Sequence, residues 1–438
     1  MTAVTRCTPP ILKMESTKKH TFFAIPMIFP PKLLKKHEMY MDIKKYFIYL
    51  HEQTISDMKL VYIFSSFAAK GGTERIFCDK MNWLAEVAGY EIVFVTYEQG
   101  NHPFAYPLSK KIRYVDLNTR FFTTGTMPLL KRIRFKFTMP RLFKHRLRQL
   151  LDEIQPNLVI STTNSLFLFR EILSMPYRHV VESHVYYGRL LQYIFTHIPW
   201  LDRKISQHLL KMLKRCEKVV VLTHKDAACW KGYDNIEVIH NVVTNYPEKI
   251  TDVADRPKRI IAVGRLHEQK GFDLLIQSWQ LIAARHPDWQ LVVYGHGGDL
   301  QKLQQQLEKA GLTSSMTFAG TTDNIYKEYQ NSAFYVMSSR YEGWGLVLVE
   351  AMSCGLPCVS FDCPYGPSDI IRDGEDGFLV ENGNIQQLAE KMELLINNKE
   401  LRERLGVRAR LNAARFTSDN IMPQWTKLFE TIVQNDNH

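Results

Sequence analysis

Short apolar runs alternate with longer amphipathic stretches from Lys59 onward, a pattern typical of repeated strand–helix units. The expected strands of the first half span 60–64, 91–96, 112–115, 158–160, 179–182 and 219–222. After a polar segment, further strands are expected at 259–263, 291–294, 316–319, 334–337 and 357–361. Runs such as 219–222, 260–263 and 291–294 are almost wholly apolar, as expected for parallel strands covered on both faces. The pattern therefore predicts an α/β chain with two Rossmann-like domains facing a central cleft.

The length of 438 residues also favours two domains over a single core. We expect an N-terminal extension over 1–57, a first domain over 58–245, a linker over 246–257, a second domain over 258–416 and a C-terminal helix over 417–438. Because the first clear strand directly follows Met58, the extension is expected to be poorly ordered or to reflect a start codon assigned too early.

Charge is divided unevenly between the two halves. The first 250 residues hold 37 basic and 21 acidic side chains, a net charge of +16, whereas the remainder holds 19 basic and 24 acidic ones, a net charge of −5. A strongly cationic half suits a polyanionic partner, which leaves nucleic acid, an anionic membrane surface and a phosphate-rich substrate open.

The seven cysteines form no C-x-x-C pair, and the spacing of Cys354, Cys358 and Cys363 fits no common zinc pattern. We therefore expect reduced thiols and no metal site. No run of 18 or more apolar residues occurs, so no segment is expected to span a membrane.

A glycine pair, Gly71 and Gly72, lies between the first expected strand and a helix. Glycine allows a close backbone approach to a phosphate, and the following helix N-terminus offers free N–H groups. A plain strand-to-helix turn is the alternative. The sequence G-x-G-x-x-G is absent at this place, which argues against a dinucleotide-dependent enzyme.

Two cations, Arg265 and Lys270, follow the first strand of the second half. The carboxyl edge of a parallel sheet is where open α/β folds bind ligands. Two positive charges there can neutralise a diphosphate that gains charge as a glycosidic bond breaks. Solvated basic residues on a loop are the less favoured reading.

Two glutamates, Glu342 and Glu350, stand eight positions apart in the segment 340–352. Gly343 and Gly345 keep Glu342 in the loop before a helix, whereas Glu350 lies about one turn into that helix and leans back toward its N-terminus. The pair is expected to line one pocket, where carboxylates accept hydrogen bonds from hydroxyls and N–H groups bind phosphate.

These segments together resemble glycosyltransferase family 4, the retaining enzymes with a GT-B fold that build surface polysaccharides and lipid-linked glycans. The resemblance runs from about residue 58 to 416 and includes the segments 71–75, 264–271 and 342–350, with weaker matches at 219–223, 239–241, 295–297, 366–371 and 376–380. It implies a nucleotide-sugar donor, a UDP-sugar by default, no required metal or other cofactor, and a lipid-linked or growing glycan acceptor.

The resemblance also implies residue roles. Glu350 would hold the ribose hydroxyls, Glu342 and His184 would lie beside the donor sugar, and Arg265 and Lys270 would bind the diphosphate. His184 could hydrogen-bond either a sugar hydroxyl or a backbone carbonyl. The implied catalytic set is His184, Glu342, Arg265 and Lys270, and the implied donor-binding set is Gly71, Gly72, Arg265, Lys270, Gly343, Trp344, Gly345, Leu346 and Glu350.

A basic segment at 131–148 contains eight cations, no acidic residue and interleaved aromatic and aliphatic side chains. We expect it to bind an anionic membrane surface or the acceptor, which would place the enzyme in the cytoplasm at the inner face of the membrane. An ordinary helix with a solvated basic face is the alternative. The cations are Lys131, Arg132, Arg134, Lys136, Arg141, Lys144, Arg146 and Arg148.

Two other readings stay open. A nucleic-acid-binding protein would explain the cationic half, but the sequence contains no recognised nucleic-acid motif and such a protein has no use for the paired carboxylates. A sugar-nucleotide epimerase or a phosphorylase on the same fold would use a similar pocket for different chemistry.

Overall fold

A computed structural model describes residues 58–121, 129–192, 198–243, 245–252 and 256–434, without the side chains of 129–137. The predicted extension over 1–57 lies outside these residues. The two sheets described below belong to one compact unit that begins at Ile55.

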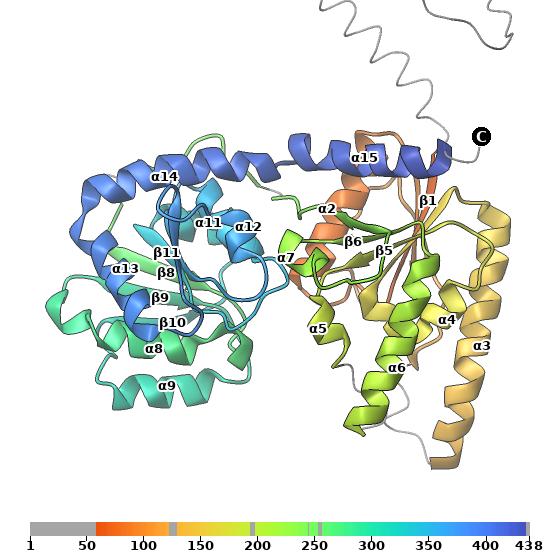
Figure 1. Cartoon of the computed structure of the whole chain (residues 1–438), viewed down its shortest axis with the longest axis horizontal. Coiled ribbons are helices and arrows are strands. Elements are labelled where there is room, and N and C mark those ends of the chain that lie inside the picture. The colour runs from red at the N-terminus through yellow and green to blue at the C-terminus, as the bar shows by residue number, and fades with distance from the viewer. Residues whose placement is uncertain (1–57, 122–128, 193–197, 244, 253–255, 435–438) are drawn as a thin grey trace, which may run out of the picture. The chain divides into compact units, whose positions relative to one another are not determined.

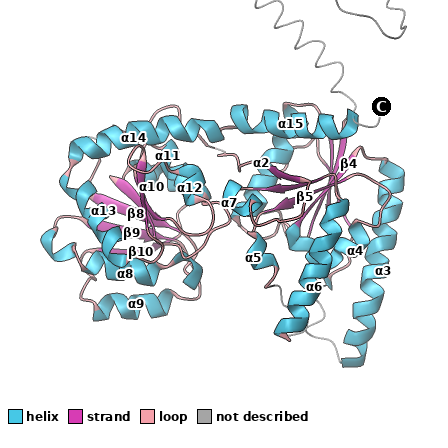
Figure 2. Ribbon diagram, in the orientation of Figure 1, coloured by secondary structure: helices cyan, strands magenta, loops and turns pink. Residues whose placement is uncertain are grey.

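The first sheet has seven strands, all parallel, in the order β3-β2-β1-β4-β5-β6-β7. Figure 2 draws the strands of both sheets in magenta and the helices around them in cyan. Its inner strands are buried along nearly their whole length, as the apolar runs predict. The strands are β1 (Lys59–Phe64), β2 (Glu91–Thr96), β3 (Arg113–Asp116), β4 (Leu158–Thr162), β5 (His179–Ser183), β6 (Lys218–Val221) and β7 (Ile236–Val238).

The second sheet has six parallel strands in the order β10-β9-β8-β11-β12-β13. In both sheets the first strand in the sequence lies in the interior of the sheet. The chain adds strands from it toward one edge and then returns to add the remaining strands toward the other edge, which is the doubly wound arrangement. The strands are β8 (Arg259–Val263), β9 (Gln290–Tyr294), β10 (Met316–Gly320), β11 (Phe334–Met337), β12 (Cys358–Phe361) and β13 (Gly377–Val380).

Helices connect the strands and cover the sheets (Figure 1). Each longer helix buries one apolar stripe; α2, for example, buries Phe77, Met81 and Leu84. Those that follow strands of the first sheet are α2 (Gly72–Glu86), α3 (Leu129–Ile154), α4 (Phe169–Ile172), α5 (Tyr187–Leu190), α6 (Pro199–Met212) and α7 (His224–Ala227). The later ones are α8 (Phe272–Gln280), α9 (Leu300–Lys309), α10 (Ile325–Gln330), α11 (Leu346–Ser353), α12 (Pro367–Ile370), α13 (Ile385–Asn397), α14 (Lys399–Ala413) and α15 (Ser418–Gln434).

The last helix, α15, contacts the first half of the chain although it follows the second sheet. The Tyr90 hydroxyl lies 3.4 Å from Glu430 Oε1, and the Lys80 ammonium lies 3.8 Å from the centre of the Trp425 ring. Figure 1 shows α15 running past α2. The C-terminal helix expected from the sequence thus adds to the packing of the first half.

Two edge strands, β7 and β13, are missing from the sequence-based expectation. β7 has three residues, all half-buried, and β13 begins at a glycine, so neither gives a long apolar run. An edge strand pairs on one side only, and its weaker pattern is hard to distinguish from a loop.

The basic segment at 131–148 lies on α3. Phe143 and Leu147, two of its interleaved apolar residues, are fully buried against the first sheet. Arg146 donates hydrogen bonds to the carbonyls of Leu117 and Asn118. Lys131, Arg132, Arg134 and Lys136 have side chains outside the described part of the chain, and Arg141, Lys144 and Arg148 face outward or lie half-exposed.

Candidate active site

Four loops that follow parallel strands carry the predicted site residues. The Gly71 loop follows β1, His184 follows β5, the segment 264–271 follows β8, and the segment 338–345 follows β11. Carboxyl ends of parallel strands are where doubly wound sheets bind their ligands. The prediction that these residue types stand at sheet edges therefore agrees with the topology.

Arg265 is exposed, and its guanidinium forms no hydrogen bond or ion pair with the described residues. Glu74 on α2 lies within electrostatic reach: burial raises the pKa of its carboxyl, whereas the charges of Arg265 and His184 lower it. An exposed guanidinium without a bound carboxylate is available to an anionic ligand.

Lys270 is in a different state, because its ammonium forms an ion pair with Glu342. Nζ lies 2.6 Å from Glu342 Oε1, and that oxygen also accepts a hydrogen bond from Ser339 Oγ at 2.6 Å. Both charged side chains are largely buried, at 14% and 8% exposure. The two predicted cations therefore differ: Arg265 is unpaired among described residues, and Lys270 is neutralised by Glu342.

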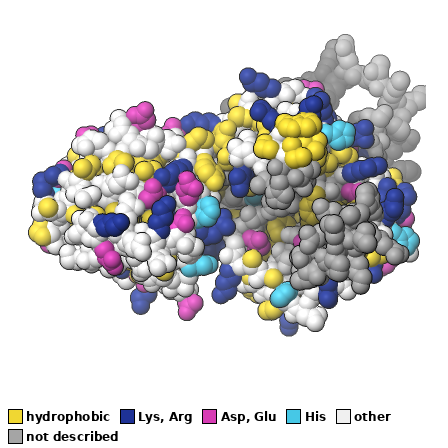
Figure 3. All heavy atoms as spheres, turned by 90° about the horizontal axis from the view of Figure 1, so that it is seen from below, with side chains coloured by type: hydrophobic (Ala, Val, Ile, Leu, Met, Phe, Trp, Pro, Cys, Tyr) yellow, Lys and Arg dark blue, Asp and Glu magenta, His cyan; other side chains and the backbone are white. Residues whose placement is uncertain are grey.

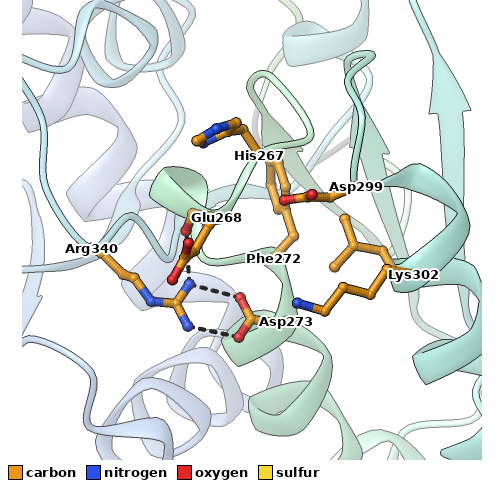
Figure 4. A pocket seen from close by; sticks show the side chains of 8 residues that line it. His267, Glu268, Phe272, Asp273, Asp299, Lys302 and Arg340 are labelled. Atoms are coloured by element: carbon orange, nitrogen blue, oxygen red, sulfur yellow. Dashed lines mark hydrogen bonds and ion pairs between the residues drawn. The ribbon is translucent and has the colours of Figure 1, made fainter. Parts of the chain in front are cut away.

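Arg340 fixes the two loops that carry these residues (Figure 4). Its guanidinium binds both carboxylate oxygens of Asp273 at 2.8 and 2.7 Å and the carbonyl of Glu268 at 2.8 Å. Its backbone N–H donates to the carbonyl of Gln269 at 2.8 Å. A small pocket of about 80 Å³ lies beside this crosslink, lined by His267, Glu268, Phe272, Asp273, Asp299, Lys302, Leu303 and Arg340.

The glycines of the segment 342–346 have distinct structural roles. A side chain at Gly343 would place its Cβ 2.6 Å from the carbonyl oxygen of His184, so this loop approaches the first half backbone to backbone. Gly345 has φ +97°, a left-handed conformation that disfavours other residues, and it caps α11. Leu346 is the first residue of that helix, whose first N–H groups have no intrahelical partner.

Glu350 lies on α11 as predicted, one turn after the helix begins, and is buried. Its Oε1 lies 3.3 Å from Arg75 Nη1 on α2, and its Oε2 accepts a hydrogen bond from the Tyr329 hydroxyl at 3.4 Å. Burial raises the pKa of this carboxyl, although Arg75 and Tyr329 partly oppose the shift. Glu342 and Glu350 therefore have different cationic partners, Lys270 and Arg75.

Trp344 is placed in the interior, at 2% exposure. Its ring stacks on His240 at a centroid distance of 6.3 Å and meets Phe416 edge-on at 5.1 Å. Its indole is packed between His240 and Phe416, so a ligand on this loop would meet the backbone at position 344.

His184 directly follows β5 and is held on two sides. Its Nε2 lies 3.2 Å from Glu182 Oε2, and its ring lies 4.9 Å from that of Phe77. Glu182 in turn forms a buried ion pair with Lys80 on α2.

Gly71 and Gly72 stand at the N-terminus of α2, and they differ in their surroundings. The Glu74 carboxylate folds over Gly71, where an added Cβ would meet it at 2.1 Å. At Gly72, an added Cβ would have no neighbour within 4 Å. The open side of this turn is therefore at Gly72.

Within the described residues, no three His, Cys, Asp or Glu side chains come together as a metal site would require. The same residues contain no helix with the length and apolarity needed to cross a membrane. On the face drawn in Figure 3, Lys and Arg side chains are dispersed among acidic and hydrophobic ones.

Two family models match the chain. The model described as Glycosyltransferase Family 4 matches residues 70–245, and the model described as Glycosyl transferases group 1 matches residues 247–412. A Haemophilus influenzae protein named "Uncharacterized glycosyltransferase" is 30% identical over 373 residues, which cover 84% of this chain and 98% of that relative.

The chain belongs to glycosyltransferase family 4. It is therefore a glycosyltransferase with a GT-B fold, as the sequence predicts.

Further relatives of this glycosyltransferase match over smaller spans or at lower identity. A Staphylococcus aureus protein named "Poly(ribitol-phosphate) alpha-N-acetylglucosaminyltransferase" is 30% identical over 236 residues, 52% of this chain and 47% of the relative. A crystal structure of a variant of S. aureus TarM, in complex with fondaparinux, alpha-GlcNAc-glycerol and UDP, has a TM-score of 0.67 at 18% identity and covers 85% of this chain and 99% of that one. At this identity the likeness supports the fold.

Several side chains at these loops were not predicted from the sequence: Arg75, Lys80, Glu182, Tyr329 and Arg340. Arg75 and Arg340 lie inside the segments 71–75 and 340–352 that the sequence singles out, so their position in the sequence is a usable signal. Lys80 and Tyr329 lie in helices without a local motif, so only the tertiary structure reveals them.

Proposed function

We propose that this glycosyltransferase moves a sugar from a nucleotide sugar, with a UDP-sugar favoured, to a glycan or lipid-linked acceptor with retention of anomeric configuration. The observation that carries the proposal is the unpaired, exposed Arg265 at the same sheet edge as the Lys270–Glu342 pair and the N-terminus of α11. This arrangement offers positive charge for a diphosphate and a carboxylate for sugar hydroxyls.

In this proposal Arg265 binds the diphosphate, and the N–H groups at the start of α11 bind its oxygens. Lys270 exchanges part of its contact with Glu342 for phosphate, which frees Glu342 to accept from a hydroxyl of the donor sugar. Glu350 accepts from the ribose hydroxyls in place of the Arg75 and Tyr329 contacts. His184 contacts the sugar, and Gly72 leaves room for the ligand on the side of the first half.

The reaction proposed is a transfer on one face of the sugar. The acceptor hydroxyl oxygen bonds to the anomeric carbon as the bond from that carbon to the diphosphate oxygen breaks. A diphosphate oxygen takes the proton of the acceptor hydroxyl. Stabilising the negative charge on the leaving group is then the main contribution of the protein, and Arg265 and Lys270 supply it.

The same cations are the reason to propose that transfer needs no metal ion. A divalent metal in other nucleotide-sugar enzymes neutralises the diphosphate, and here two side chains and a helix N-terminus offer that charge. Transfer should therefore continue in the presence of EDTA.

For the acceptor, we propose a phosphate-rich glycan or lipid-linked glycan that binds the first half. The net charge of +16 over residues 1–250 favours such a polyanion. The name of the S. aureus relative, which includes poly(ribitol-phosphate), supports the same acceptor class. The exposed cations of α3 would also hold the enzyme at the inner face of the cytoplasmic membrane.

The test is a transfer assay with UDP-sugars in the presence of EDTA, run with and without an anionic glycan acceptor. Release of UDP that depends on an anionic glycan acceptor, with the sugar recovered on that acceptor, supports the proposal. Conversion of the donor sugar without an acceptor would indicate an epimerase instead, and tight binding of polynucleotide without UDP release would indicate a nucleic-acid-binding protein.

A further inference from the structure

A buried ion pair outside the donor site lies directly behind His184. Lys80 on α2 and Glu182 on β5 bind each other at only 3% and 2% side-chain exposure. Removing two charges from water is costly unless each has further partners. Both have them: Lys80 lies over the rings of Trp425 and Phe77, at 3.8 and 4.5 Å, and Glu182 contacts His184.

Glu182 determines which ring nitrogen of His184 carries the hydrogen, and Lys80 keeps Glu182 ionised. Burial alone would raise the pKa of Glu182, but the charge of Lys80 and the hydrogen bond from His184 lower it overall, so the carboxyl is ionised at neutral pH. An ionised carboxylate can only accept a hydrogen bond. Nε2 of His184, 3.2 Å away, must therefore carry the hydrogen.

The other ring nitrogen of a neutral His184 is then an acceptor. When Nε2 is protonated in a neutral imidazole, Nδ1 carries a lone pair. No hydrogen bond from the described residues engages Nδ1. Glu74 on α2 lies within electrostatic reach of both His184 and Arg265.

We propose that Lys80 and Glu182 are positioning residues that hold His184 as the Nε2–H tautomer, so that Nδ1 accepts a hydrogen bond from a sugar hydroxyl. The inference rests on the proposed role of His184 at the sugar, and it decides between the two partners considered for this side chain. A backbone carbonyl is excluded as a partner of Nδ1, because a carbonyl cannot donate.

The C-terminal helix α15 contributes to the surroundings of the Lys80–Glu182 pair. Trp425 on α15 covers Lys80, and Arg178 donates to the carbonyl of Ile432 on the same helix. Helix α15, which follows the second sheet in the sequence, thus covers the Lys80–Glu182 ion pair that orients His184. The indole face also supplies Lys80 with a favourable contact that a water molecule would otherwise provide.

The experiment is NMR of the full chain with ¹⁵N-labelled histidine at neutral pH, with His184 identified among the 15 histidines by the signal lost in His184→Gln. In the wild type, the neutral imidazole of His184 is expected to be the Nε2–H tautomer alone. The double variant Lys80→Met/Glu182→Gln leaves no buried charge unpaired, and its amide can donate or accept, so it is expected to show a mixture of tautomers.

The matched control is Lys218→Met/Glu237→Gln, which removes a half-exposed Lys–Glu pair with a 3.2 Å separation in the same sheet. It should leave the His184 signals unchanged. An Nδ1–H tautomer in the wild type would overturn the inference without any variant, as would the same His184 spectrum in the double variant and the control.

The result is separable from the proposed function because the spectrum needs no substrate. If His184 shows the expected tautomer while His184→Gln transfers sugar normally, the positioning stands and the role of His184 in transfer fails. If transfer depends on His184, the double variant should lower it on the order of 10- to 100-fold, by analogy with the loss of partners that orient metal-ligating histidines.

Discussion

Arg265 and Lys270 lie five positions apart in one loop, yet their environments differ. Arg265 is exposed and has no ion-pair partner among the described side chains, whereas Lys270 contacts Glu342 at 2.6 Å. A ligand that binds the Arg265 guanidinium displaces no partner among the described side chains, but one that binds Lys270 must compete with Glu342. Arg265 is therefore the clearer point at which to test diphosphate binding.

Arg265→Ala should lower the rate of transfer by about 10²- to 10³-fold, the effect of removing one donor that stabilises developing negative charge. Its melting temperature should stay within about 1 °C of the wild type, because the variant leaves no partner unsatisfied. Arg404→Ala, an exposed change on α14, is the control for both measurements. Wild-type transfer by Arg265→Ala would remove this residue from the donor site.

Glu350→Gln should change the pH dependence of stability. Because the folded-state pKa of Glu350 is raised above 4.5, its contribution is present at low pH and is lost as the pH rises through the folded-state pKa. The variant, measured by urea unfolding from pH 4 to 8, should therefore gain stability relative to the wild type as the pH rises.

Glu328 supplies a control of opposite sign. Burial tends to raise its pKa, but Tyr294 and Arg259 lower it overall, so its contribution is present at neutral pH and lost as the pH falls. Glu328→Gln should accordingly be destabilising at pH 7 and less so near pH 4. Parallel pH profiles for the two variants would contradict the assignment of the Glu350 shift.

At this scale the sequence predicts where the chemistry lies but not which side chains pair. Glycines, cations and glutamates beside predicted strands were enough to locate Arg265, Lys270, Glu342 and Glu350 at sheet edges. The contact of Glu350 with Arg75 joins residues 275 positions apart, and no local pattern indicates it. The family resemblance places Trp344 in the donor-binding set, although its side chain packs inside.

The loops of the site act as elements that are fixed to one another. Arg340 joins the segment before Glu342 to the segment around Lys270 through its contacts with Asp273, Glu268 and Gln269. Ser338 adds a hydrogen bond to the carbonyl of Lys270 at 3.0 Å. The Lys270–Glu342 distance therefore depends on a crosslink outside the pair.

Arg340→Ala should lower the rate of transfer clearly while it destabilises the fold only modestly. The expected loss of unfolding free energy is about 1–2 kcal/mol, because the charge-assisted hydrogen bonds are partly exposed to solvent. Arg285→Ala removes a similar two-point contact with Glu393 far along the chain from the site loops and should leave transfer unchanged. Equal effects of the two variants on transfer would show that the Arg340 crosslink is not specific to the site.

For α3, the structure changes the choice of variant. Arg146 binds backbone carbonyls at the end of β3, so its removal would disturb the fold. Replacing Arg141, Lys144 and Arg148 with Gln should instead weaken binding to anionic vesicles by about 100-fold, at roughly 1 kcal/mol for each cation. Sedimentation with vesicles measures the change, with Lys302, Lys309 and Arg404 replaced in the control.

At the element scale, all eleven strands expected from the sequence have counterparts in the structure, most within one or two residues at each end. Parallel strands buried on both faces give continuous apolar runs, which explains this accuracy. The apolar residues of α3 were weighed as membrane-facing, but Phe143 and Leu147 face the sheet. An amphipathic pattern does not say whether the apolar side meets a core or a lipid.

For the whole molecule, the repeated strand order explains why the apolar pattern of the sequence predicts two similar halves built from strand–helix units. The interactions between segments far apart in the sequence could not be predicted from that pattern. Besides Arg75–Glu350, Lys225 binds Asp362 at 3.0 Å, and α15 contacts the first half through Trp425 and Glu430. Such contacts depend on the tertiary arrangement, which periodicity does not encode.

We propose that Arg265 and its neighbours bind a nucleotide diphosphate without a metal ion. The direct test is a thermal-shift titration of the full chain with UDP, GDP and ADP in EDTA, repeated with Arg265→Ala. We expect a selective rise in melting temperature with one nucleotide, UDP favoured, that is lost in Arg265→Ala. A rise that requires added metal, or an equal rise in wild type and Arg265→Ala, would contradict it.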